Sequence, residues 1–193
     1  MKRTFPLLLL GLITLISAPT TFGQTTQKPD DSARVKTRDH LKQLLETAGP
    51  KIGVTFHQSD KQPFNMVGVL KDGLKNANSY EIVIGVTDDQ TIGFRVYPYY
   101  KDSYVNVDKA RNNLALMRQL LRFSDKNFLF WGADETGDIF AGYTFTLESG
   151  FPDAALAIVV QSIPNLDQYL GEMLPNVDGG PALSTKKIRD LNN

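Results

Sequence analysis

Two runs of alternating apolar side chains on either side of one acidic turn constrain the fold of this chain more than any other feature. In residues 80–86 and 92–96 every second side chain is apolar, and Asp88-Asp89-Gln90 separates the two runs. Side chains of a strand point alternately to its two faces, so each run offers one face to a core. The pattern predicts a β-hairpin that buries Tyr80, Ile82, Ile84, Val86, Ile92, Phe94 and Val96.

A second hairpin is predicted from residues 128–133 and 139–147, with the turn Asp134-Glu135-Thr136-Gly137 between them. One side of its second strand is apolar and consists of Ile139, Ala141, Tyr143, Phe145 and Leu147. Turn-forming residues also bound two earlier strands, which we expect at residues 51–58 and 65–70. Strands that short turns connect pair in an antiparallel way.

Three segments have the spacing of amphipathic helices. The first begins at Asp31 or Ser32 and ends at Ala48, where Gly49-Pro50 follows. The second is expected to open at Asp108. Its buried side is expected to consist of Val107, Ala110, Leu114, Met117 and Leu121, which recur at helical spacing. Leu116 and Leu120 flank this apolar stripe. Its other side is basic and carries Lys109, Arg111, Arg118 and Arg122.

The third helical segment begins at Pro152 and extends to Met173, and Pro164 must kink or split it. Together the elements predict an α+β domain with the order α-β-β-β-α-β-β-α. Long amphipathic helices at both ends and in the middle of the chain imply that helices cover one face of the sheet. We therefore expect an antiparallel sheet with the helices packed on one face.

The first 23 residues have the composition of a signal peptide. Lys2 and Arg3 precede an apolar run at residues 7–16, which is shorter than the roughly 20 residues of a membrane-spanning helix. Small residues at positions 21 and 23 favour cleavage before Gln24. We expect an exported protein, periplasmic or secreted, without a stable membrane anchor after cleavage. The rest is predicted to form a flexible linker at 24–31, one domain at 32–175 and a flexible tail at 176–193.

Composition excludes several classes of function. Without residues 1–23 the chain has 19 basic and 21 acidic residues, a formal charge of −2, so we expect no nucleic-acid partner. It has no cysteine, and its two histidines, His40 and His57, lack neighbours at metal-binding spacing. The acidic stretches at 88–89 and 134–138 fit turns better than calcium loops. No nucleotide or nucleophile motif is present, so we expect no cofactor, metal or catalytic residue.

Aromatic side chains provide the only candidate recognition site. Four tyrosines cluster near the end of the first hairpin, Trp131 lies in the second, and Pro98 indicates that the strand end lies at an edge of the sheet. Amphipathic aromatic residues are enriched in binding surfaces, although packing under a loop explains such clusters as well. The candidate interface residues are Tyr97, Tyr99, Tyr100, Tyr104 and Trp131.

The order of the elements, together with three segments of the chain, resembles the YbjN-like family. The segments are the helix NNLALMRQLLRF, the hairpin NFLFWGADETGDIFAGYTFTL and the closing helix FPDAALAIVVQSI. The resemblance covers about residues 35–175 and implies a fold like that of the type III secretion chaperones. It implies a domain that pairs with itself or cradles another polypeptide, with no catalytic residues to carry over. Those chaperones work in the cytoplasm and this chain begins with an export signal, so only the scaffold is transferred.

Two hypotheses of function follow. The first is an exported, non-enzymatic binding or chaperone-like module, expected to be a homodimer or to bind another polypeptide. The alternative is a periplasmic carrier that holds a small apolar ligand in a pocket between helices and sheet. A hydrolase without a recognisable motif ranks last.

Overall fold

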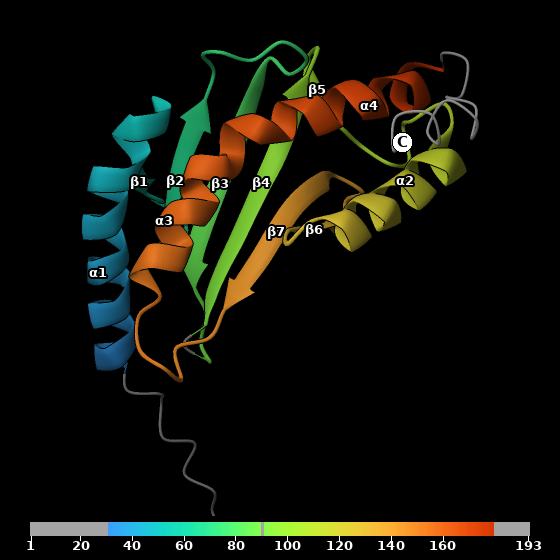
Figure 1. The fold of residues 1–193 in the computed structure, drawn as a ribbon. Helices are drawn as coiled ribbons and strands as arrows, with labels where there is room; N and C mark the ends of the chain where they lie inside the picture. Colours follow the sequence, from blue (N-terminus) through green and yellow to red (C-terminus); the bar gives the residue numbers. More distant parts are fainter. Residues whose placement is uncertain (1–30, 90, 180–193) are drawn as a thin grey trace, which may run out of the picture.

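The computed structural model describes residues 31–89 and 91–179, which form one antiparallel sheet with helices against it (Figure 1). Neighbouring strands follow the order β1-β2-β3-β4-β7-β6, and β5 pairs with the end of β4. The strands are β1 (His57–Gln58), β2 (Asn65–Leu70), β3 (Ser79–Val86), β4 (Ile92–Tyr100), β5 (Ser103–Tyr104), β6 (Phe130–Ala133) and β7 (Ile139–Phe145).

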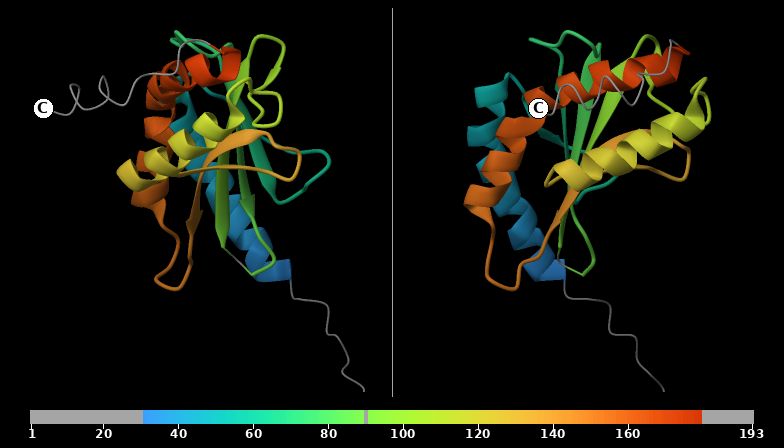
Figure 2. Two further views of the ribbon diagram at one scale, coloured as in Figure 1. Left: turned by 90° about the vertical axis from the view of Figure 1, so that its right-hand side faces the viewer. Right: turned by 45° about the vertical axis from the view of Figure 1, so that its right-hand side comes forward.

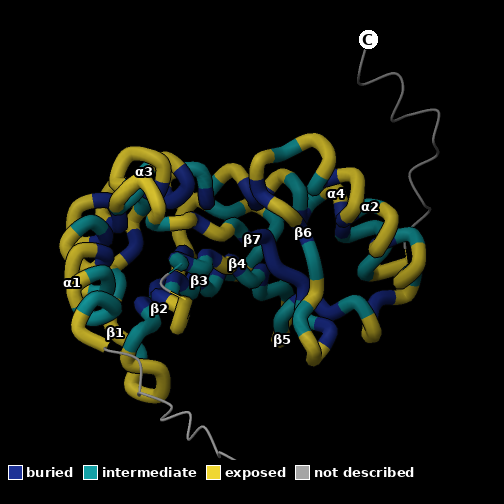
Figure 3. The backbone as a smooth tube through the Cα atoms, turned by 90° about the horizontal axis from the view of Figure 1, so that it is seen from below, coloured by how far each residue is buried: buried dark blue, intermediate teal, exposed yellow. Residues whose placement is uncertain are grey.

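The helices of the described residues are α1 (Asp31–Ala48), α2 (Asn113–Lys126), α3 (Asp153–Ser162) and α4 (Leu166–Asp178). They lie along one side of the sheet, with α1 beside α3 and α2 beside α4 (Figures 1 and 3). The predicted α+β class, the antiparallel sheet and the coverage of one face are confirmed. The short strand β5 was not predicted.

Both predicted hairpins are present because their alternation and turns are local properties of the sequence. Ile82 of β3 is in register with Val96 of β4, and Val96 with Ala141 of β7, and all three are fully buried under the helices. Burial of such a row is stabilising because it removes apolar surface from water. The core therefore lies between the helices and one face of the sheet.

The strand predicted at residues 51–58 is wrong over most of its length. Gly49–Ile52 forms a short 3-10 helix, and only His57–Gln58 pairs with β2. Pro50 stands at the start of that 3-10 helix, where its fixed φ fits. The turn closes at Gly53, whose φ of 72° favours glycine. Turn geometry therefore overrides the strand-like composition here.

The second helix differs from its prediction in start and in rotation. It begins at Asn113, because the buried Asn106 side chain accepts hydrogen bonds from the backbone N–H groups of Asp108 and Lys109 and holds a turn there. Asp108 therefore does not open the helix. The buried residues of α2 are Leu116, Leu120 and Phe123, whereas the predicted inner residues Leu114, Met117 and Leu121 are exposed.

The closing helix is split at Pro164, as predicted. A 3-10 turn, Ile163–Asn165, separates α3 from α4, and the chain changes direction there (Figure 2, right). Helix α4 extends to Asp178, so residues 176–178 are helical rather than part of the predicted tail. The predicted signal peptide, residues 24–30 of the linker and residues 180–193 of the tail lie outside the described residues.

Candidate functional site

One face of the sheet is left uncovered by the helices of the described chain. In β3 and β4 buried residues alternate with less buried ones, whose side chains therefore point away from the core, to the side that we call the open face. Figure 3 shows no helix of the described chain over this side of the sheet. Open faces of antiparallel sheets are usually polar. This one is largely apolar or aromatic, and it includes Val67, Val69, Val83, Tyr97, Tyr99, Tyr104, Phe130 and Phe140.

Five rings on the open face contact one another in sequence and form a continuous aromatic row. Starting at the β6 side, the centroid distances are 5.7 Å from Phe130 to Phe140, 5.7 Å from Phe140 to Tyr97, 5.9 Å from Tyr97 to Tyr104 and 5.5 Å from Tyr104 to Tyr99. The tilted and edge-to-face angles of these pairs are those that aromatic rings prefer. We call these five residues the aromatic row.

Gly142 of β7 leaves room for two rings of the aromatic row, those of Phe130 and Phe140. A Cβ at Gly142 would lie 2.8 Å from the Phe130 ring, 3.1 Å from the Phe140 ring and 3.1 Å from the Phe94 carbonyl oxygen. Both rings therefore lie close over the bare backbone of β7. A larger residue at this position would displace them.

Charged groups flank the aromatic row on two strands. The Arg95 guanidinium lies 4.6 Å from the centroid of Phe140, within the range of a cation–π contact. The Tyr104 hydroxyl donates a hydrogen bond to the Glu81 carboxylate. Burial, followed by this hydrogen bond, raises the pKa of Tyr104 above its ordinary value of 10.0. The open face thus combines rings that pack against one another with the positive side chain of Arg95 and the negative side chain of Glu81.

The five candidate interface residues fall into two groups. Tyr97, Tyr99 and Tyr104 lie together in the aromatic row, whereas Trp131 points to the helix side and is 4% exposed. Its ring lies 5.7 Å from that of Phe123. It is therefore a core residue in the described chain, not part of the open face.

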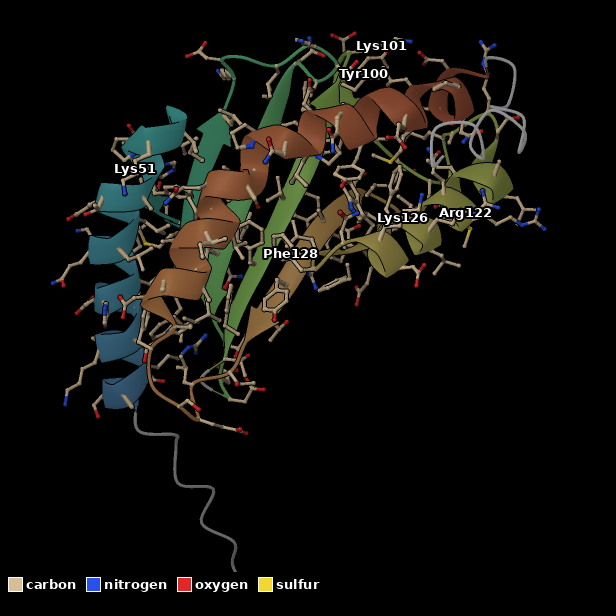
Figure 4. The ribbon with its side chains drawn as sticks, in the orientation of Figure 1. Lys51, Tyr100, Lys101, Arg122, Lys126 and Phe128 are labelled. Carbon is tan, nitrogen blue, oxygen red and sulfur yellow. The ribbon has the colours of Figure 1, made fainter. Side chains whose placement is uncertain are left out.

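Tyr100, the remaining candidate, also points away from the aromatic row. Its hydroxyl donates to a carboxylate oxygen of Asp178 at 2.9 Å, and the Lys101 ammonium donates to the other oxygen at 2.7 Å (Figure 4). The bond from Lys101 lowers the pKa of Asp178, and the bond to Asp178 raises that of Tyr100. These contacts join the end of β4 to the end of α4.

The sequence analysis missed Phe130, Phe140 and Arg95. Their signal is the same alternation that predicted the hairpins, because the residues between the buried ones must point to the other face. Phe140 lies between Ile139 and Ala141, which point to the helix side, and it is itself 6% exposed because neighbouring rings and Arg95 cover it on the open face. The alternation that buries one set of residues in each strand also places a second set, including Phe130, Phe140 and Arg95, on the opposite face.

The prediction that Pro98 marks a sheet edge is wrong. Strand β4 lies between β3 and β7, and Pro98 is in register with Tyr80 while its carbonyl oxygen accepts the Val105 N–H at 3.0 Å. The pairing of β4 with β7 stops at Val96, and next to Pro98 the Val105 carbonyl oxygen accepts the Ile139 N–H at 2.8 Å. A residue without an N–H is therefore tolerated at position 98.

The two actual edges of the sheet are β1 and β6. At β6 the Trp131 backbone N–H donates to the Ser124 hydroxyl at 2.7 Å, and that hydroxyl lies 3.2 Å from the Trp131 carbonyl oxygen. A side chain of α2 thus occupies backbone groups that an added strand would need.

A pocket of about 220 Å³ lies on the helix side, between the end of α2 and the bend at Pro164. Phe128, Leu129, Trp131, Leu166 and Tyr169 form its apolar walls, with Asn127, Ser162, Asn165 and Gln168 between them. The indole N–H of Trp131 is buried and has no acceptor among the described residues. The pocket is therefore a second place where a small ligand fits.

The acidic residues of the two hairpin turns make hydrogen bonds and an ion pair within the fold. A carboxylate oxygen of Asp134 accepts the backbone N–H groups of Thr136 and Asp138, each at 3.0 Å, which closes the second hairpin. Asp88 forms an ion pair with Arg34 of α1, and Asp89 accepts a hydrogen bond from the Thr87 hydroxyl.

His40 contacts Asp153 at 2.8 Å and stacks on Phe151. Within residues 31–89 and 91–179 no three acidic or histidine side chains converge as metal ligands.

Comparison with family models, with curated proteins and with solved structures finds no match for this chain. Among the helices in the described part of the chain, none has the length and apolar character to cross a membrane.

Proposed function

We propose that this chain is an exported, non-enzymatic binding module that holds a polypeptide, in the first place a second copy of itself, against the aromatic row. The continuous contact of five rings on an uncovered sheet face is the observation that carries the proposal. Rings that already pack against one another lose little conformational entropy on binding. Tyrosine and phenylalanine also supply large contact areas, and tyrosine is a frequent energetic anchor of interfaces.

The charges on the open face favour a second copy as the partner. Glu81 of β3 and Arg95 of β4 lie on neighbouring strands of the same face. In a two-fold contact the same surface meets itself, so an acidic group of one copy can face a basic group of the other. Two such sheets would pack about 10 Å apart with their open faces together.

Replacing both Tyr97 and Tyr99 by alanine tests this proposal. We expect self-association to weaken by more than about 2 kcal/mol, about thirtyfold in Kd, because two of the five rings of the contact are removed. Sedimentation equilibrium measures the constant, and circular dichroism shows whether the fold is retained. Tyr100→Ala is the matched control, since Tyr100 lies on the helix side, and its dimer constant should equal that of the parent.

Two outcomes would contradict the proposal. A double variant that keeps both the fold and the parental dimer constant would remove the open face as the interface. If the double variant loses its fold while the separate Tyr100→Ala variant keeps it, Tyr97 and Tyr99 belong to the core.

The pocket at the bend of α3 and α4 supports a second function, the transport of a small apolar ligand. Five of its nine lining residues are aromatic or aliphatic, and one of these, Trp131, has a buried indole N–H that lacks an acceptor among the described residues. This combination suits an apolar molecule with one hydrogen-bond acceptor. A native mass spectrum of protein purified from its own host should then show a bound mass. Gln168→Trp, which places a ring at the rim, should remove that mass, and a parent without any adduct would contradict carriage.

A further inference from the structure

Four large apolar side chains in and just after α2 are at least half exposed. The exposed fractions are 59% for Leu114, 50% for Met117, 70% for Leu121 and 56% for Phe128. The three α2 residues are spaced three and four apart, so their side chains share one side of the helix. Phe128 follows in the turn after α2 (Figure 4), and its ring lies 6.4 Å from that of Tyr143. We call Leu114, Met117 and Leu121 the α2 stripe.

The core does not need the α2 stripe. A different side of the helix packs on β6 and α4 through Leu116, Leu120 and Phe123. The Gln119 side chain adds hydrogen bonds to α4, with its amide donating to the Glu172 carbonyl at 2.9 Å and accepting from Asn176 at 2.8 Å. Figure 2 (left) shows α2 in front of the sheet, facing the viewer. Contiguous exposed apolar residues of this kind mark an interaction site.

The charged side chains of α2 indicate that the partner surface of the α2 stripe is anionic. Arg118, Arg122 and Lys126 are exposed, and none of them has an ion-pair partner within residues 31–89 and 91–179. Asp125 is the one acidic residue of the helix. A helix with leucine and methionine on one side and arginine and lysine next to them is typical of a helix that lies on an anionic membrane surface.

The chain's own C-terminal residues have the same sign of charge. The Arg111 side chain lies against Gly179, and the Arg111 N–H donates to the Val177 carbonyl at 3.1 Å, so α4 ends next to the start of α2. Residues 180–193 follow from that point and contain Lys186, Lys187 and Arg189 against a single acid, Asp190. Like charges disfavour this segment, and equally the α2 of a second copy, as the cover of the stripe. They add to the attraction of an anionic surface.

We propose that the α2 stripe docks this protein on an anionic phospholipid surface. The apolar side chains enter the boundary between headgroups and acyl chains, and Arg118, Arg122 and Lys126 pair with lipid phosphates. The helix lies in the plane of the surface and does not cross it. The docking surface is separate from the open face of the sheet, so it does not depend on the binding function proposed above.

Sedimentation with vesicles tests the docking, on protein purified from its own host. The two probes are vesicles of phosphatidylcholine alone and vesicles of phosphatidylcholine with phosphatidylglycerol in equal parts. We expect the parent to bind the anionic vesicles and to be released by salt. Leu114→Ser with Leu121→Ser should weaken this binding about tenfold, and Arg118→Gln with Arg122→Gln by a similar factor. Ile158→Ser is the matched control, because Ile158 is 64% exposed on α3, and should bind as the parent does.

Four results would overturn the proposal. Equal binding to both kinds of vesicle, or to neither, would contradict anionic recognition. Loss of binding in Ile158→Ser to the same extent as in the leucine variant would show that the stripe is not specific. A parent that is dimeric without lipid, and that Leu114→Ser with Leu121→Ser makes monomeric, would assign the stripe to a second copy, and capture of an acidic polypeptide in place of vesicles would assign it to a protein partner.

Discussion

Replacement of Trp131 by alanine is expected to lower the free energy of unfolding by about 4 kcal/mol. The side chain is 4% exposed, and its ring lies 5.7 Å from Phe123 of α2 and 5.8 Å from Tyr169 of α4. Alanine would leave a cavity where β6, α2 and α4 meet, and the backbone of three elements limits how far the site can collapse. Urea unfolding followed by circular dichroism measures the loss.

Trp131→Phe is the control for the size of that cavity. Phenylalanine keeps a ring between Phe123 and Tyr169 and removes the indole N–H, which has no acceptor among the described residues. We therefore expect a loss of about 1 kcal/mol, well below that of alanine. A Trp131→Ala protein that unfolds at the parental urea concentration, yet binds its partner more weakly, would return this residue to the interface.

Replacement of Asp167 by alanine is expected to cost about 3 kcal/mol of stability. Asp167 is 7% exposed in the first turn of α4, and its carboxylate accepts the backbone N–H groups of Lys75 at 2.7 Å, Asn76 at 3.1 Å and Ala77 at 2.8 Å. The Asn76 amide also donates to the Asp167 carbonyl at 2.9 Å. One side chain thereby holds residues 75–77 of the loop between β2 and β3. Its removal leaves three N–H groups without their acceptor.

Asp167→Asn is the graded control, because an amide keeps one of the two oxygens, and about half the loss is expected. Amide hydrogen exchange adds a local readout, in which Lys75, Asn76 and Ala77 should exchange faster in the alanine variant. Asp153→Ala, at a more exposed position of α3, should leave stability within about 0.5 kcal/mol of the parent. A parental stability for Asp167→Ala would show that the loop does not depend on this carboxylate.

The open face and the α2 stripe are proposed to act on different partners. The first presents rings fixed by one another, with Glu81 and Arg95 beside them, and suits a polypeptide. The second presents exposed leucine and methionine side chains next to arginines that have no ion-pair partner among the described residues, and suits lipid. Because the surfaces are built from different elements, the Tyr97 and Tyr99 variant should keep vesicle binding, and the Leu114 and Leu121 variant should keep self-association.

Sequence reasoning succeeded where the determining interactions are local. Helix α1 ends at Ala48 because Gly49-Pro50 follows, and the closing helix is split because Pro164 removes a helical hydrogen bond. The hairpin β3–β4 follows from alternation on both sides of a short polar turn. In each case residues a few positions apart carry the signal, so a window of the sequence contains the cause.

The prediction from sequence was wrong where a helix or strand has apolar residues on two sides, because either side could then pack against the core. Helix α2 has apolar residues both at 116, 120 and 123 and at 114, 117 and 121, and both sets have helical spacing. Packing against β6 and α4 selects the first set. Trp131 and Phe130 are adjacent aromatic residues of β6, and pairing with β7 decides that Trp131 is buried while Phe130 is exposed.

The sequence by itself determined the class of the fold, the two hairpins, the split of the last helix and the presence of a tyrosine cluster, because propensity, alternation and turn chemistry act over a few residues. Only the tertiary structure decided which tyrosines lie together, that Phe130 and Phe140 extend them into the aromatic row, and that Leu114, Met117 and Leu121 face outward. Those outcomes depend on strand register and on the rotation of α2. Both are set by contacts between residues far apart in the chain, and no local pattern contains them.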